Sequence, residues 1–185
     1  MSTTISGTAL NVATITSPTL ITPIINGMGS SILTSGTAVA STSGTSIDFT
    51  GIPSWAKRIT VMFNGVSVNG VADVIVQVGS GTVATTGYLT TRSYLVTSSV
   101  GAGASSSTSI FIAATNLAAD LKCGHVILTN ISSNIWVSSG VISASSLVTW
   151  GAGNITLSGT LDRVRITTSN GTDLFDAGSI NILYE

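Results

Sequence analysis

Charge is almost absent from this chain, and that scarcity limits what it can fold into. Of 185 residues, 6 are basic and 7 are acidic, so only 7% are charged, against about 25% in an average soluble domain. A surface helix needs polar and charged residues along its solvent face, and this chain has too few of them. It is rich instead in Val, Ile and Thr, whose branched side chains favour extended strands. The composition therefore predicts an all-β fold.

Alternating residue patterns support this prediction from residue 46 onward. In KRITVMFNGVSV, residues 57–68, the side chains of Ile59, Val61 and Phe63 share one face of a strand. Similar short segments recur along the chain, separated by turn signals such as Asn64-Gly65 and Asn170-Gly171. Many short strands at this spacing indicate a β-sandwich or jelly roll. NLAADL, residues 116–121, is the one segment for which we expect a helical turn.

Residues 1–46 carry no charge and differ in composition from the rest of the chain. Their two prolines each follow Ser or Thr, which favours extended backbone and excludes a central strand. An extended apolar segment of this kind has no core of its own to enter. We interpret it as an anchor arm that packs on another protein, rather than as a solvated tail, and residues 47–185 as the β-sandwich. The candidate anchor residues are Pro18, Leu20, Pro23, Ile24 and Ile25.

The partners expected of such a chain are other protein surfaces. Its net charge is only −1, and apolar surface with few charges is suited to burial, most simply in a symmetric homo-oligomer. A monomer kept soluble by Ser, Thr and Asn is the alternative. Six scattered basic residues give no patch for nucleic acid. We expect no membrane insertion, because Leu20–Leu33 is interrupted by polar residues, Gly and Pro.

The inventory of residues that could carry chemistry is small. His125 is the only histidine, and no Gly-x-Ser-x-Gly motif accompanies it. Cys123, the only cysteine, cannot complete a zinc site with one histidine, and it fits a reducing cytoplasm. Asp173 and Asp176 bracket a turn, which favours turn geometry over calcium binding and over glycoside chemistry. We therefore expect no catalytic residues, cofactor or metal.

Two further groups of residues are candidates for contacts with partners. Asp162, Arg163 and Arg165 form the densest charge cluster, either as an ion pair between subunits or as a solvated strand face. Trp136 and Trp150 are candidates for stacking on sugar rings, because aromatic faces suit apolar C–H patches. The alternative for each tryptophan is a place in the core or in an interface.

Two blocks of sequence resemble a module of tailed-bacteriophage virion proteins. FTGIPSWAKRITVMFNGVS with the following VIVQVGSG is similar to its beginning, and LSGTLDRVRITTSNGTDLFDAGSINILYE is similar to its end. The resemblance implies a trimeric β-sandwich in the virion, assembled in the bacterial cytoplasm. Because the arm is short, it favours a head fibre, capsid decoration or tail-associated fibre, bound to other virion proteins. The alternative is a receptor-binding fibre module that contacts host glycans.

Overall fold

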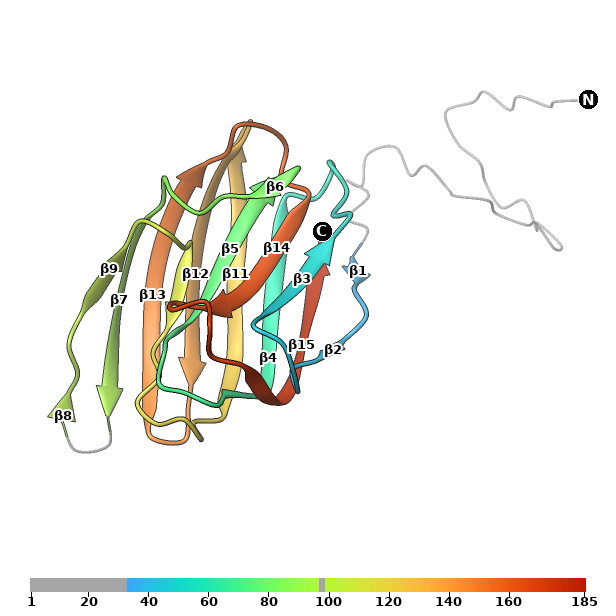
Figure 1. Cartoon of the computed structure of the whole chain (residues 1–185). Coiled ribbons are helices and arrows are strands. Elements are labelled where there is room, and N and C mark those ends of the chain that lie inside the picture. Colours follow the sequence, from blue (N-terminus) through green and yellow to red (C-terminus); the bar gives the residue numbers. More distant parts are fainter. Residues whose placement is uncertain (1–32, 97–98) are drawn as a thin grey trace, which may run out of the picture. The chain divides into compact units, whose positions relative to one another are not determined.

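The computed structural model describes residues 33–96 and 99–185, and this part of the chain is a β-sandwich without a helix (Figure 1). The predicted all-β class is confirmed. The expected helical turn at residues 116–121 is a plain turn, because the Asp120 carboxylate accepts the amides of Asn116 and Leu117 at 3.0 and 2.9 Å. Since these residues include no helix, none of them forms a helix that could span a membrane.

The strands are β1 (Thr34–Ser35), β2 (Val39–Ala40), β3 (Ser46–Thr50), β4 (Arg58–Val68), β5 (Val74–Ser80), β6 (Thr82–Val83), β7 (Leu89–Val96), β8 (Ser99–Val100), β9 (Ala104–Ser106), β10 (Phe111–Ala113), β11 (Lys122–Ser132), β12 (Ile135–Ser143), β13 (Leu147–Thr156), β14 (Arg163–Thr168) and β15 (Phe175–Tyr184).

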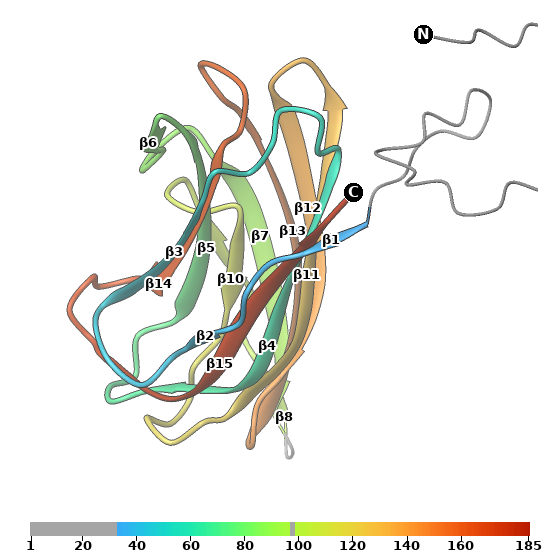
Figure 2. The ribbon, with the colours of Figure 1, turned by 90° about the vertical axis from the view of Figure 1, so that its right-hand side faces the viewer.

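These strands form two antiparallel sheets of unequal width that face each other (Figure 2). The large sheet has ten strands in the order β1-β15-β4-β11-β12-β13-β7-β8, with β2 beside β15 and β9 beside β7. The small sheet has five strands in the order β10-β5-β14-β3, with β6 beside β5. One face of the large sheet therefore packs on the small sheet, and its other face points away from it.

Strand β4 shows how the sequence pattern sets the core. Ile59, Val61 and Phe63 are buried as predicted, and the residues between them point outward. At Asn64-Gly65 the pairing with β11 shifts register, and Gly65 has φ +64°, which favours glycine. After this bulge both faces of β4 are buried. The core between the sheets continues through Phe49, Val76, Val78, Phe111, Val126, Leu128, Trp136, Ile142, Ile155, Val164, Ile166, Phe175 and Ile180.

Buried hydroxyls on the large sheet satisfy the free edge of the small sheet. Strand β10 pairs with β5 on one side only, and unpaired backbone groups inside a protein need partners. Ser138 and Thr90 donate to the carbonyls of Ile110 and Ser109, while Thr149 accepts the amide of Ala114 at 3.1 Å. Ser and Thr side chains therefore form hydrogen bonds inside the core as well as at the surface.

The sandwich begins earlier in the chain than predicted. Strands β1 and β2 both pair with β15, and the amide of Gly36 donates to the carbonyl of Ile182 at 2.8 Å. The segment from Thr34 to Ala40 therefore belongs to the edge of the large sheet, and the expected boundary at 46/47 is corrected. An apolar segment without charge can add to a sheet edge through backbone hydrogen bonds alone, so composition did not separate it from the arm.

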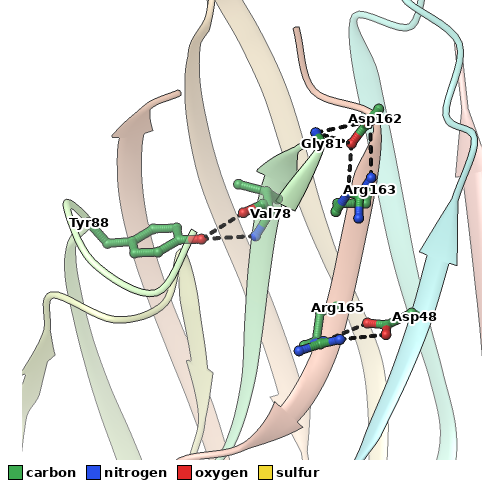
Figure 3. Close-up of polar contacts among 7 residues, drawn as sticks. All are labelled: Asp48, Val78, Gly81, Tyr88, Asp162, Arg163 and Arg165. Carbon is green, nitrogen blue, oxygen red and sulfur yellow. Dashed lines mark hydrogen bonds and ion pairs between the residues drawn. The ribbon is translucent and has the colours of Figure 1, made fainter. Parts of the chain in front are cut away.

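Two buried polar side chains, Tyr88 and Lys122, differ in whether they have hydrogen-bond partners among the described residues. The Tyr88 hydroxyl accepts the amide of Val78 at 3.0 Å (Figure 3). It also lies 2.9 Å from the Ala84 carbonyl oxygen. Its burial raises the pKa of Tyr88 to about 12. Lys122 is fully buried, yet its Nζ makes no hydrogen bond to the described residues. Burial lowers the pKa of Lys122, although Asp120 and more distant carboxylates act in the other direction.

Replacing Tyr88 by Phe should lower the free energy of unfolding by about 1–2 kcal/mol, because the buried Val78 amide and Ala84 carbonyl lose their partner. Urea denaturation of both proteins measures this difference. Tyr94→Phe, which removes a hydroxyl from a partly exposed tyrosine, is the control and should leave the stability nearly unchanged. Equal effects of the two substitutions would contradict the assigned role of Tyr88.

Replacing Lys122 by Met should raise the free energy of unfolding by about 1 kcal/mol at neutral pH, because it removes a buried ammonium without a hydrogen-bond partner. Asp120 stays satisfied in the variant, since Asn116, Leu117 and Ser146 still donate to its carboxylate.

The pH dependence provides a second check on Lys122. Because its pKa is lowered in the folded state, the unfolded chain binds a proton that the folded chain has released, and stability rises as the pH increases toward 10.5. Unfolding measured below pH 10.0, the pH at which a free tyrosine is half ionised, should show this rise for the natural chain and a smaller one for Lys122→Met. A variant that is markedly less stable, with an unchanged pH profile, would contradict the prediction.

Candidate functional site: the outer face of the large sheet

The face of the large sheet that points away from the small sheet carries almost no charge over five strands. Its outward side chains come from β4, β11, β12, β13 and β7, where they alternate with buried ones. Arg58, at one end of β4, is the only residue among them with a formal charge at neutral pH. We call this surface the outer face; its members are Arg58, Thr60, Met62, Asn64, Cys123, His125, Ile127, Thr129, Ile131, Ile135, Val137, Ser139, Val141, Ser143, Val148, Trp150, Ala152, Asn154, Thr156, Leu89, Thr91, Ser93 and Leu95.

Strand pairing places these residues in rows across the sheet. His125 lies opposite Val141, Val141 opposite Trp150, and Trp150 opposite Ser93. Paired residues on one face are close enough for their side chains to touch. The row through Trp150 therefore forms a band of one imidazole, two apolar side chains and one hydroxyl across β11, β12, β13 and β7.

A shallow hollow of about 670 Å³ lies over the middle of the outer face. Trp150, Val141 and Ile127 line it together with His125, Arg92 and the small residues around them. Its walls offer aliphatic and aromatic surface with a few hydroxyls. The hollow therefore suits an uncharged partner, either a protein side chain or the face of a sugar ring.

The opposite surface, on the small sheet, is different because its charges are paired. Arg165 on β14 donates two hydrogen bonds, of 2.6 and 2.7 Å, to the carboxylate of Asp48 on β3 (Figure 3). Arg163 binds Asp162 at 2.8 and 3.2 Å. The same Asp162 carboxylate accepts the amide of Gly81 at 3.1 Å and so holds the turn between β5 and β6.

The members of the predicted charge cluster form their ion pairs within this chain. Hydrogen bonds from the Arg163 guanidinium, opposed by slight burial and aided by the Gly81 amide, lower the pKa of Asp162. The Asp48 carboxylate likewise raises the pKa of Arg165. Asp162, Arg163 and Arg165 thus find partners within their own chain, and their positions are explained without a second subunit.

The two candidate tryptophans have separate environments. Trp150 is 43% exposed on the outer face, whereas Trp136 is 3% exposed and belongs to the core. A buried ring cannot stack on a sugar at the surface, so the expected glycan contact at Trp136 is corrected. Trp136 and Trp150 sit on adjacent strands but point to opposite faces of the large sheet, because strand side chains alternate.

The remaining predicted residues are the two turn aspartates and the anchor candidates. Asp173 reaches across to the loop after β4, where it accepts the Ala72 amide at 3.0 Å, and Asn170 donates to it at 2.8 Å. Ser67 donates a hydrogen bond to Asp176. Within residues 33–96 and 99–185, no three His, Cys, Asp or Glu side chains come together as a metal site. The candidate anchor residues Pro18, Leu20, Pro23, Ile24 and Ile25 lie outside the described residues.

His125 and Cys123 both point outward from β11. In register, His125 lies between Met62 and Val141, neither of which is an acid or a nucleophile. Cys123 is exposed, and its sulfur accepts the amide of Gly65 at 3.3 Å. The sequence did not single out the outer face as a surface, because its members are ordinary apolar and hydroxyl residues dispersed over five strands.

Comparisons of the chain with protein-family models, with curated proteins and with solved structures found no match.

Proposed function

We propose that this chain is a structural, non-enzymatic subunit of a bacteriophage particle: a short trimeric head fibre, capsid decoration or tail-associated fibre protein. The observation that carries the proposal is the outer face, which is wide, almost uncharged and rich in exposed apolar side chains between hydroxyl residues. Monomeric proteins rarely expose contiguous apolar surface of this kind, whereas subunits of assemblies need it. The resemblance of residues 47–185 to the virion module supports the same proposal.

In this proposal the uncharged N-terminal segment binds the particle, and the sandwich projects from it. Leu20, Ile24 and Ile25 supply apolar contacts to another virion protein, and an arm of this kind can add backbone hydrogen bonds to a sheet edge of that protein. The arm is considered to end before Thr34, because β1 is part of the sandwich. Neither a cofactor nor nucleic acid has a role in this function.

A second candidate function is recognition of a neutral host glycan, and the exposed ring of Trp150 beside the hollow favours it. The imidazole of His125 and nearby hydroxyls could bond sugar hydroxyls. Arg92, the charged residue that lines the hollow, is 8% exposed and paired with Asp73, so a neutral saccharide would fit better than a charged one.

Deleting residues 1–32 should leave a folded oligomer that no longer enters particles, because the sandwich retains β1 while the proposed anchor is lost. Tagged chains produced during infection can be followed into purified particles by immunoblotting, with circular dichroism to confirm the fold. The triple variant Leu20→Ser, Ile24→Ser, Ile25→Ser should show the same defect without shortening the chain. Normal incorporation of both variants would refute the anchoring role, and absence of the full chain from particles would refute the proposed function.

Replacing Trp150 by Ala tests the glycan candidate. If the ring stacks on a sugar, glycan-array binding should weaken by about tenfold, the size expected for loss of one aromatic contact. Trp55→Ala is a matched control, since Trp55 is 44% exposed and lies outside the outer face. An absence of binding by the natural chain, or equal losses in both variants, would remove the glycan candidate.

A further inference from the structure

The outer face concentrates exposed apolar side chains near the middle and one side of the large sheet. Seven large apolar residues on it are between 36% and 71% exposed: Leu89, Leu95, Ile131, Ile135, Val141, Val148 and Trp150. Six of them lie on three neighbouring strands, β7, β12 and β13, which pair in continuous register, while Ile131 lies on β11 at a shift in register. These side chains therefore form one surface rather than scattered exposures.

Strands β5 and β12 differ in how their two faces are covered. Both faces of strand β5 are covered. Ile75 and Gln77 point away from Val76 and Val78, yet they are only 5% and 7% exposed. Strand β12 carries apolar residues on both faces, with Trp136 and Ile142 inward and Ile135, Val137 and Val141 outward. Strands with two apolar faces are typical of sheets buried on both sides. In β12 the residues that the structure describes cover only one of them.

The charges of the chain limit what can cover the other face. The small-sheet surface carries Asp48, Asp162, Arg163 and Arg165 in paired form, while the outer face has Arg58 at its margin alone. A charged partner would lose water on binding here and find almost no opposite charge in return. A second copy of this chain presents an equally uncharged surface, so neither partner buries an unpaired ion.

The size of the outer face fits a stable protein contact. With about 4.8 Å between strands and about 6.8 Å between successive outward residues, five strands and four rows span roughly 650 Å² of flat area. Side-chain relief increases this value, and a standard interface buries about 800 Å² on each partner. A sugar ring would cover only a small part of such a surface.

We propose that the outer face is the surface through which copies of this chain bind one another, centred on Val141 and Trp150. The inference rests on the proposed function as an assembly subunit and names the partner of that same surface. Trp150 then lies inside the assembly, so the two candidate functions become mutually exclusive at this residue.

Replacing Val141 by Asp tests the inference, because it introduces a carboxylate at the centre of the face. Self-association, measured as mass against concentration by analytical ultracentrifugation, should weaken by at least ~100-fold, since the carboxylate would be buried without a partner. Val71→Asp is the matched control: Val71 is 67% exposed in the loop between β4 and β5, away from the outer face. The control should associate like the natural chain. High salt should not weaken the self-association of the natural chain or of Val71→Asp, because the contact contains almost no charge.

Ala152→Asp provides a second variant, in the neighbouring row of the outer face and on a different strand. Circular dichroism and the melting temperature establish that each variant is folded before its mass is interpreted. Dissociation of both outer-face variants, with Val71→Asp intact, supports the inference. If both remain associated as strongly as the natural chain, the copies meet through another surface and the inference is wrong, although incorporation into particles can still occur. A natural chain that is monomeric at all concentrations overturns the inference too, and incorporation of the tagged chain into particles then decides the proposed function separately.

Discussion

The packing of the small sheet on the inner face of the large sheet is the interaction on which the rest of the structure depends. It removes Val61, Val126, Val164 and Ile166 from water completely, and the burial of each such side chain contributes about 1.5–3 kcal/mol. Because successive strand residues alternate in direction, this contact also decides which residues point outward on β4, β11, β12, β13 and β7. A shift of one residue in any of these strands would exchange its core residues for the outer-face set.

The few charges of the chain are used where the two sheets and their turns need polar partners. Asp73 binds Arg92 at 2.7 Å and also accepts the amide of Thr115 at 2.9 Å, which ties β7 to the segment after β10. Asp120 is 1% exposed and holds the turn before β11. Burial alone would raise the pKa of Asp120, but its hydrogen bonds outweigh that effect and lower it. With the carboxylates and guanidinium groups committed in this way, the central part of the outer face is left without charge.

Sequence reasoning predicted the features that depend on neighbouring residues and missed those that depend on distant ones. The all-β class, the faces of β4 around Val61 and the turn at Asn170-Gly171 follow from local alternation and turn chemistry, and the structure confirms them. The directions of Trp136 and Trp150 could not be derived, because the strands that carry them are apolar on both faces and alternation then gives two equivalent answers. The burial of Lys122 was also missed, since a lysine at the start of a strand usually lies in solvent.

Strand β12 has apolar residues on both faces, which left the direction of Trp136 undetermined from the sequence. The same feature bears on assembly. In a free β-sandwich, selection against aggregation places charged or strongly polar residues on the solvent side of each sheet. The small sheet follows this rule, with Arg163 and Arg165 facing solvent beside their carboxylate partners. The large sheet does not follow it over β12 and β13, where Val141, Val148 and Trp150 are exposed. One chain thus contains a sheet surface adapted to water and another that is not, and this contrast is explained most directly if only the first of them meets water in the assembled protein.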